Sequence, residues 1–355
     1  MIMELQHRIN AFVHLGRFIG QFSSENHSEK KGVHLNEVYF EAMKEQLAIA
    51  EVNNGWFSKG NLRFALMSWS EALSEENLKQ WCESYTFTKK TPTTVAIIMA
   101  GNIPLVGFHD FLSVLLSGNK VLGKLSSNDK FLLPFFGKYL EAIEPQFKEC
   151  ISFTSERMTG FDAVIATGSN NTARYFEYYF GKYPNIIRKN RNTLAILTGK
   201  ESEAEMKELS NDIFRYFGLG CRNVSKIYLP KDYNFDHFFN AMYHWKDVIN
   251  DSKYMNNYDY NKAVYLMSNI DLLDNEFMLL KEDETFSSPI SVVFYEKYDD
   301  INVLREKLVS QSENIQCIVG NNGTHDEVNF GVAQTPKLWD YADGVDTMDF
   351  LLKLT

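Results

Sequence analysis

The first ninety residues carry apolar side chains at a helical period. Between Leu35 and Val52 these residues fall close to one face of a helix, and the run stops at the Asn-Asn-Gly sequence of residues 53–55, which commonly ends helices. The segment 61–73 repeats the same pattern. We therefore predict an N-terminal helical region over residues 1–90.

Beyond this region the pattern changes to short apolar runs separated by helix-like stretches. The run from Thr93 to Ala100 follows Pro92 and is rich in β-branched residues, which is typical of a strand buried on both faces. Further strands are predicted at 120–125, 150–153 and 161–166, and helices at 105–117, 129–143 with a kink near Pro134, and 170–180. This alternation predicts right-handed crossovers and a doubly wound parallel sheet, which binds ligands beyond the carboxyl ends of its strands.

The alternation starts again near Ser202, which indicates a second α/β unit. We expect helices at 202–217, 236–248 and 301–309, and strands at 224–229, 290–294 and 315–319. The predicted fold class is α/β, with two doubly wound parallel-sheet domains. The first covers residues 1–200 and includes the helical region, the second covers 201–330, and residues 331–355 form a C-terminal closing segment.

The charge of the chain limits its partners. Lysine and arginine number 36 against 46 acids, and the net charge of -10 argues against nucleic acid or an anionic membrane as a partner. The longest apolar stretches, such as Val95 to Ala100, fall far short of the roughly 18 residues that cross a bilayer. Residues 1–7 lack the apolar core of a signal peptide. The four cysteines are widely spaced, so we expect reduced thiols and a cytoplasmic protein.

Common nucleotide and metal motifs are missing from the sequence. Gly118 to Lys124 has the glycine and lysine spacing of a P-loop, but Leu125 stands where a hydroxyl would bind magnesium. No Gly-x-Gly-x-x-Gly follows a predicted strand. The histidines and cysteines form no ligand pattern, and Asp340, Asp343 and Asp346 lack the spacing of a calcium loop. We therefore predict no metal site.

Three short segments are candidates for chemistry. Cys221 follows a glycine turn that leaves room for a ligand to reach the sulfur, whereas the other cysteines lie within predicted helices or strands. Asn102 comes at the carboxyl end of the first strand, where its amide either reaches into the crevice or caps the backbone. Gly168 and Ser169 join a strand to a helix, where they either bind a phosphate or form an ordinary turn.

Taken in order, these segments resemble the aldehyde dehydrogenase superfamily. The resemblance rests on Asn-x-Pro after the first strand, the segments 118–119 and 124–126, the turn 167–169, the cysteine turn, and the sequence Glu-Thr-Phe-Ser-Ser-Pro at 284–289. Residues 100–105, 220–222 and above all 334–347 are similar to the acyl-CoA reductase of bacterial bioluminescence fatty-acid reductase complexes. The resemblance spans nearly the whole chain and implies an aldehyde dehydrogenase-like fold.

The resemblance implies how the chain would bind its cofactor. Lys124 and Ser126 would contact the adenosine ribose, with Lys124 neutralising the 2′-phosphate if the cofactor is NADPH; NADH is the alternative. Gly168 and Ser169 would hold the pyrophosphate, and the pair Glu284 and Phe286 would position the nicotinamide ribose and ring. The domain 1–200 would then bind NAD(P), and the domain 201–330 would carry the catalytic thiol.

The resemblance also implies the reaction. Cys221 would accept the acyl group, and the Asn102 amide with the Cys221 main-chain N–H would form the oxyanion hole. Hydrolytic members of the superfamily carry a glutamate base after the phosphate-turn helix, but residues 188–194 contain no acid. Because a positioned base contributes about 10²- to 10⁴-fold, its absence favours reduction over hydrolysis of the acyl-enzyme. We expect NADPH-dependent reduction of a fatty acyl thioester, such as acyl-CoA, to the aldehyde.

Two other interpretations stay open at this point. The chain could act on an acyl phosphate or a free aldehyde, as other branches of the superfamily do. It could also be a non-catalytic subunit that docks the acyl chain of a reductase complex, although such a subunit has no need for Asn102, Cys221 and Gly168 together. If the chain is instead the acyl thioester reductase described above, a partner synthetase or transferase would supply its acyl group. The sequence leaves the oligomeric state open.

Overall fold

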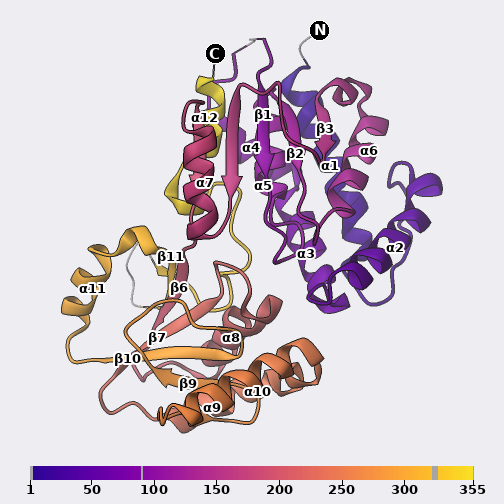
Figure 1. Cartoon of the computed structure of the whole chain (residues 1–355). Helices are drawn as coiled ribbons and strands as arrows, with labels where there is room; N and C mark the ends of the chain where they lie inside the picture. The colour runs from indigo at the N-terminus through magenta and orange to yellow at the C-terminus, as the bar shows by residue number, and fades with distance from the viewer. Residues whose placement is uncertain (1–2, 89–90, 322–326, 355) are drawn as a thin grey trace. The chain divides into compact units, whose positions relative to one another are not determined.

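The computed structural model describes residues 3–88, 91–321 and 327–354, which belong to two compact units (Figure 1). The first unit comprises Met1–Lys189 and Lys337–Thr355, and the second comprises Asn190–Pro336. The chain therefore leaves the first unit once and returns to it once. Within the described ranges, no helix is both long and apolar enough to span a bilayer.

The first unit contains a five-stranded parallel sheet with the strand order β3-β2-β1-β4-β5. The order reverses between β1 and β4, as the prediction of a doubly wound sheet requires. The strands are β1 (Thr94–Ile98), β2 (Lys120–Lys124), β3 (Ile151–Thr154), β4 (Ala163–Thr167) and β5 (Asn185–Arg188). The connecting helices are α5 (Phe108–Leu116), α6 (Leu132–Ile143) and α7 (Asn170–Phe180).

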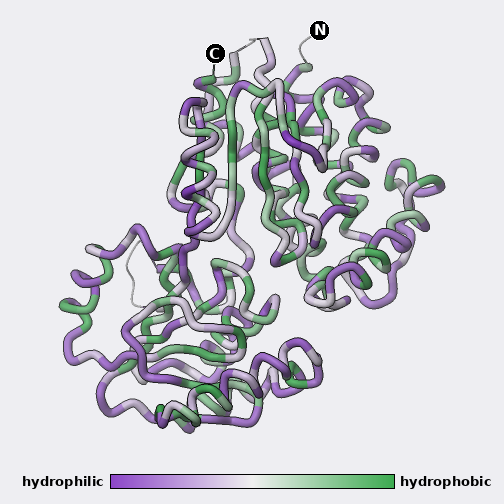
Figure 2. Tube along the Cα trace, in the orientation of Figure 1, coloured by the Kyte–Doolittle hydropathy of each residue, from purple (hydrophilic) through white to green (hydrophobic). Residues whose placement is uncertain are grey.

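Both faces of this sheet are buried, which explains the continuous apolar run in β1. Val95 and Ile97 belong to the large core formed with the N-terminal helices, α5 and α6. Ala96 faces the opposite side, where a smaller cluster includes Phe176 and Phe180 of α7. Successive strand residues point to opposite faces, so a strand covered on both sides needs apolar residues throughout. Figure 2 shows hydrophobic positions concentrated along these strands.

The predicted N-terminal helical region is confirmed, and it packs on the sheet of the first unit. Its helices are α1 (Leu5–Ile19), α2 (Asn36–Asn53), α3 (Lys59–Ala72) and α4 (Glu75–Glu83). The C-terminal segment joins the same core through α12 (Thr347–Lys353). Trp81 Nε1 donates to Tyr341 Oη at 2.6 Å, and Tyr85 Oη donates to Asp346 at 2.8 Å. Through these hydrogen bonds, the long motif 334–347 binds to α4 and to the segment that follows α4.

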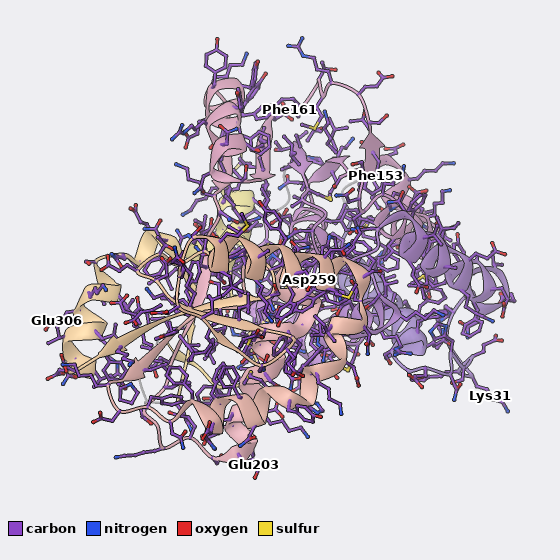
Figure 3. The ribbon with its side chains drawn as sticks, turned by 60° about the horizontal axis from the view of Figure 1, so that its bottom comes forward. Lys31, Phe153, Phe161, Glu203, Asp259 and Glu306 are labelled. Carbon is purple, nitrogen blue, oxygen red and sulfur yellow. The ribbon has the colours of Figure 1, made fainter. Side chains whose placement is uncertain are left out.

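The second unit contains a seven-stranded sheet with the order β12-β11-β6-β7-β10-β9-β8, parallel except for the pairing of β8 with β9. Its core strands are β6 (Asn192–Ile196), β7 (Val224–Pro230), β9 (Leu279–Glu282), β10 (Val292–Tyr298) and β11 (Ile315–Val319), with β8 (Leu273–Asp274) and β12 (Glu327–Val328) at the edges. The helices are α8 (Glu203–Phe214), α9 (Phe235–Met242), α10 (Ser252–Met267) and α11 (Ile301–Val309). Acidic side chains such as Glu203 and Glu306 lie on the surface of this unit (Figure 3).

Two predicted helices differ from the structure for local reasons. The helix predicted from residue 129 begins at Leu132, so Pro134 falls in its first turn and produces no kink there. The helix predicted to reach residue 217 ends at Phe214, because Tyr216 and Phe217 adopt left-handed backbone conformations, with φ of 53° and 58°. The pattern also missed β5, β6, β9 and α10, and both β6 and β9 are interior strands of the second sheet.

Candidate active site

Asn102 lies on the turn that follows β1, and the loop after β2 packs against this turn. Gly101 is buried against Ser126, so closely that a Cβ at position 101 would collide with the serine side chain. The Asn54 side chain lies between the two loops and donates to the carbonyls of Gly101 at 3.3 Å and Asn128 at 3.4 Å. The turn that carries Asn102 and the loop that carries Ser126 are therefore neighbours at one edge of the first sheet.

Asp129 holds the main chain on the C-terminal side of Asn102. Leu105 adopts a left-handed conformation with φ of 59°, and its main-chain N–H donates to Asp129 Oδ2 at 2.8 Å. The second carboxylate oxygen, Oδ1, is buried and has no hydrogen-bond partner among the described residues. Burial raises the pKa of Asp129 to about 6, although the bond from Leu105 opposes this shift. No pattern in the sequence singled out this carboxylate, whose partner Leu105 lies three residues after Asn102.

Replacing Asp129 with asparagine should change how the stability of the protein depends on pH. A folded-state pKa above the unfolded value of 3.8 means that the aspartate stabilises the fold below pH 3.8 and loses this contribution as the pH rises through about 6. The unfolding free energy of the wild type should therefore fall between pH 4 and 7, relative to Asp129→Asn, by on the order of 1 to 3 kcal/mol. Denaturant unfolding of both proteins across this range measures the difference. Parallel pH profiles would contradict the assignment.

Gly168 and Ser169 form the turn between β4 and α7. The Ser169 hydroxyl accepts from the Thr172 N–H at 3.3 Å and so caps the helix, while the Gly168 N–H donates to the Arg188 carbonyl at 3.3 Å. A Cβ on Gly168 would lie 3.0 Å from the Phe176 ring, so the turn sits tightly on its own helix. The first turn of α7 carries no acid, so no side chain of this turn offsets the positive end of the helix.

Lys124 is the last residue of β2, and its register partner in β1 is Ile98. It is partly exposed, as a residue that binds a ligand at the sheet edge needs to be. The carboxyl ends of β1, β2 and β4 thus carry Asn102, Lys124 with Ser126, and Gly168 with Ser169. All five predicted residues of the first unit follow or end strands that are neighbours in its sheet.

Cys221 lies on an exposed turn between α8 and β7. Three successive residues, Tyr216, Phe217 and Gly218, are left-handed and turn the chain sharply away from the helix. Left-handed backbone is costly for bulky residues, and such strain is common at functional turns. The glycine turn predicted from the sequence is therefore present, but two aromatic residues extend it.

Two buried polar side chains hold the Cys221 turn. Asn223 Oδ1 accepts from the Gly220 N–H at 2.7 Å, and its amide donates to the Arg215 carbonyl at 2.7 Å, at the end of α8. Thr193 of β6 donates through its hydroxyl to the Cys221 carbonyl at 2.9 Å. Both residues are almost fully buried, so the main chain on each side of the sulfur is fixed while the side chain stays exposed.

The other cysteines are in less reactive surroundings. Cys82 is buried, and burial raises the pKa of its thiol to about 11. Burial also raises the pKa of the half-buried Cys150. Because the thiolate is the nucleophile, these shifts disfavour both residues at neutral pH. Cys317 is half-buried, and its sulfur lies 3.2 Å from the Thr193 hydroxyl. Cys221 is thus the most exposed of the four thiols.

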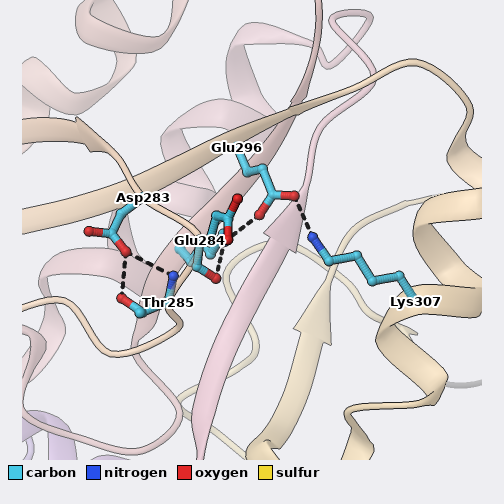
Figure 4. Close-up of polar contacts among 6 residues, drawn as sticks. Asp283, Glu284, Thr285, Glu296 and Lys307 are labelled. Carbon is cyan, nitrogen blue, oxygen red and sulfur yellow. Dashed lines mark hydrogen bonds and ion pairs between the residues drawn. The ribbon is translucent and has the colours of Figure 1, made fainter.

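Glu284 and Phe286 lie on a loop after β9, which we call the 283–286 loop. Asp283 Oδ1 accepts from the N–H and the hydroxyl of Thr285, at 2.8 and 2.7 Å, and so forms a tight turn (Figure 4). The Glu284 side chain is exposed, whereas Phe286 is half-buried. Ser225 of β7 donates to the Phe286 carbonyl at 2.7 Å. The loop therefore lies against the strand that begins just after Cys221.

The second unit brings its three predicted site residues toward one strand. Ser288 and Pro289, which follow the 283–286 loop, line a small cavity together with Phe217 and Gly218 of the cysteine turn. The turn of Cys221 and the loop of Glu284 and Phe286 are thus neighbours around the start of β7. Among the described residues, His, Cys, Asp and Glu side chains form no group of three that could hold a metal ion.

The fold is that of the aldehyde dehydrogenases. Aldehyde dehydrogenase 21 from Physcomitrella patens is similar over 90% of this chain and 74% of its own, with 12% identity and a TM-score of 0.63. The glyceraldehyde-3-phosphate dehydrogenase GapN from Methanocaldococcus jannaschii, solved with NADP, is similar over 91% of this chain and 77% of its own, with 12% identity and a TM-score of 0.61. The predicted aldehyde dehydrogenase-like fold is confirmed.

Within this fold class, the chain belongs to the acyl-CoA reductase (LuxC) family, whose profile matches residues 6–238. It is also similar to the long-chain acyl-protein thioester reductase of Aliivibrio fischeri, with 25% identity over 172 residues. That alignment covers 44% of this chain and 36% of the relative, so it spans about a third of the relative's length. The resemblance seen in the sequence to acyl-CoA reductases is confirmed.

Proposed function

We propose that this protein reduces a fatty acyl thioester, such as acyl-CoA, to the aldehyde through an acyl group carried on Cys221. The observation that supports this most strongly is a single exposed cysteine on a turn that Asn223 and Thr193 hold by main-chain hydrogen bonds. In the first step the Cys221 sulfur bonds to the acyl carbon, the bond from that carbon to the CoA sulfur breaks, and CoA leaves as the thiol with the cysteine proton.

Asn102 is proposed as a donor to the carbonyl oxygen of the acyl group, together with the Cys221 main-chain N–H. An amide side chain suits this role because it donates without changing its charge as the oxygen becomes negative. The contacts of Asn54 and Asp129 hold the backbone on either side of this asparagine. A donor fixed before the reaction avoids the cost of reorganisation during it.

The described residues fit a nicotinamide cofactor. The strand order of the first sheet reverses between β1 and β4, which is where doubly wound sheets bind dinucleotides. We propose that Gly168 and Ser169, at the positive end of α7, hold the pyrophosphate, and that Lys124 and Ser126 contact the adenosine ribose. Lys124 favours NADPH over NADH because a lysine can pair with a 2′-phosphate. When bound, the reduced nicotinamide would supply a hydride to the acyl carbon, and the bond from that carbon to the Cys221 sulfur would break, releasing the aldehyde and the Cys221 thiolate.

The remaining proposals concern the second unit and the partners. Glu284 and Phe286 would contact the nicotinamide ribose and ring, so the first unit would bind most of the dinucleotide and the second would carry the thiol.

The segment where hydrolytic members of the superfamily carry a glutamate base has no acid here, at residues 188–194. Arg188 has a structural role, since it pairs with Asp110 at 2.5 Å. This supports reduction rather than hydrolysis. We further propose a cytoplasmic enzyme that receives its acyl group from acyl-CoA, an acyl carrier, or a partner synthetase or transferase.

A comparison of substrates with the purified protein tests the proposed function. The protein is incubated with a long-chain acyl-CoA, acetyl-CoA, an acyl phosphate or a free aldehyde, each with NADPH and with NADH. We expect aldehyde to form from the long-chain acyl-CoA, with a kcat/KM for NADPH at least about tenfold above that for NADH, as roughly 1.4 kcal/mol of phosphate recognition would give. Activity only on the acyl phosphate would favour another branch of the superfamily. Unchanged NADPH fluorescence on titration would indicate a docking subunit.

A further inference from the structure

Lys226 is a buried lysine that none of the proposed roles uses. It lies on β7, shortly after Cys221, and its side chain has no exposed surface. Its ammonium binds the Glu296 carboxylate of the neighbouring strand β10 at 2.7 Å and lies 4.9 Å from the centre of the Tyr228 ring. A buried ammonium needs a counter-ion, and Glu296 supplies it. This pairing alone gives no reason for a charged residue at an interior position of the sheet.

The second hydrogen bond of Lys226 provides that reason. Its ammonium donates to the main-chain carbonyl of Glu284 at 2.9 Å and lies 5.6 Å from the centre of the Phe286 ring. The preceding residue, Ser225, donates to the Phe286 carbonyl at 2.7 Å. Two adjacent side chains of β7 therefore bind the main chain on both sides of Thr285. The 283–286 loop therefore lies along β7.

Stability alone accounts poorly for this arrangement. The cost of removing both charges from water largely cancels the attraction within a buried ion pair, so apolar residues at both 226 and 296 would serve the core as well. Glu296 also has a second partner, because Lys307 binds its other oxygen at 2.5 Å. Beyond this pairing, Lys226 links Glu296 to the main-chain carbonyl of Glu284 in the 283–286 loop.

We propose that Lys226, held by Glu296, is a positioning residue that sets the 283–286 loop against the strand leading from Cys221. Reduction of the acyl group would then depend on Lys226, whereas acylation of Cys221 would not, because the Cys221 turn is held separately by Asn223 and Thr193. This inference rests on the proposed function, in which the loop contacts the nicotinamide. A misplacement of about 1 Å at a reacting group can cost about 10²-fold in rate, so a small shift of the loop would be measurable.

The experiment compares the two half-reactions in Lys226→Met. Radiolabelled long-chain acyl-CoA without cofactor gives the rate of acylation, and NADPH added to the isolated acyl-enzyme gives the rate of aldehyde formation. We expect acylation within about threefold of the wild type and aldehyde formation lowered by about 10- to 100-fold. The variant should fold, since methionine has a similar length and Glu296 keeps Lys307 as its partner. Ser225→Ala removes the other anchor without a buried charge and should lower the same step by about threefold to tenfold.

Lys262→Met is the matched control. Lys262 lies on α10 of the same unit and pairs with Asp274 at 2.6 Å. Both of its half-reactions should match the wild type. Equal losses of acylation and reduction in Lys226→Met and Ser225→Ala would overturn the proposal, as would unchanged reduction in both. A wild type that is not acylated, or that does not reduce its acyl group, would instead refute the proposed function.

Discussion

Cys221→Ala should lose covalent acyl labelling and reductase activity together. The substitution removes the only atom proposed to accept the acyl group, so turnover should fall by at least about 10³-fold, to background. The turn should persist, because Asn223 and Thr193 hold its main chain and the cysteine side chain is exposed. Incubation with radiolabelled acyl-CoA, followed by denaturation and counting of protein-bound label, measures the effect.

Cys150→Ala is the control for this experiment. Its thiol is half-buried and burial raises its pKa, so we expect labelling and turnover close to the wild type. Thermal unfolding of both variants checks that the fold is intact. Label retained at wild-type stoichiometry in Cys221→Ala would show that another residue carries the acyl group.

Asn102→Ala should lower turnover by about 10²- to 10³-fold, the usual cost of removing one oxyanion donor. Both acylation and reduction pass through a negatively charged oxygen, so both steps should slow, unlike the selective loss expected for Lys226→Met. The melting temperature should change little, because Asn102 is half-exposed on a turn that other residues hold. Single-turnover labelling and steady-state aldehyde formation measure the two steps.

Asn102→Asp gives a sharper comparison than alanine alone. The carboxylate has nearly the same shape but accepts hydrogen bonds and repels a negative oxygen, so activity should fall at least as far as in Asn102→Ala. Substitution of the neighbouring half-buried Ile103 with alanine controls for general disturbance of the turn. Activity close to the wild type in Asn102→Asp would remove this residue from the reaction.

Elements with a strong local pattern were predictable from the sequence. The bounds predicted for α7, α11 and β11 agree with the structure, since each has a clear period and a clear stop. The strand β6 was missed because its five residues, Asn192–Ile196, follow a polar, basic stretch and have no turn signal before them. Its burial depends on β7 and β11 on either side, which local sequence does not reveal.

The site was predictable in its reactive groups but not in their supports. A cysteine beside glycines and an asparagine after a buried strand are visible in the sequence, and family resemblance gives them roles. Thr193, Asn223 and Lys226 act through contacts with segments that are distant in sequence or through the main chain of a neighbouring turn. The contacts of Thr193 and of Lys226 with Glu296 exist only once β6, β7 and β10 are side by side. Asp129 reaches Leu105 in the same way.

The return of the chain to the first unit has a consequence for the order of folding during synthesis. Met348 and Leu351 of α12 are fully buried, Leu351 accepts from Asn119 at 3.1 Å, and Thr347 accepts from Arg188 at 3.0 Å. A ribosome releases all of residues 190–336 before this helix, so the inserted unit can finish its sheet while the earlier one still has an open core. The unit that is translated first is therefore the last to complete its core. A chain that terminates before α12 would leave the apolar side chains of that core exposed.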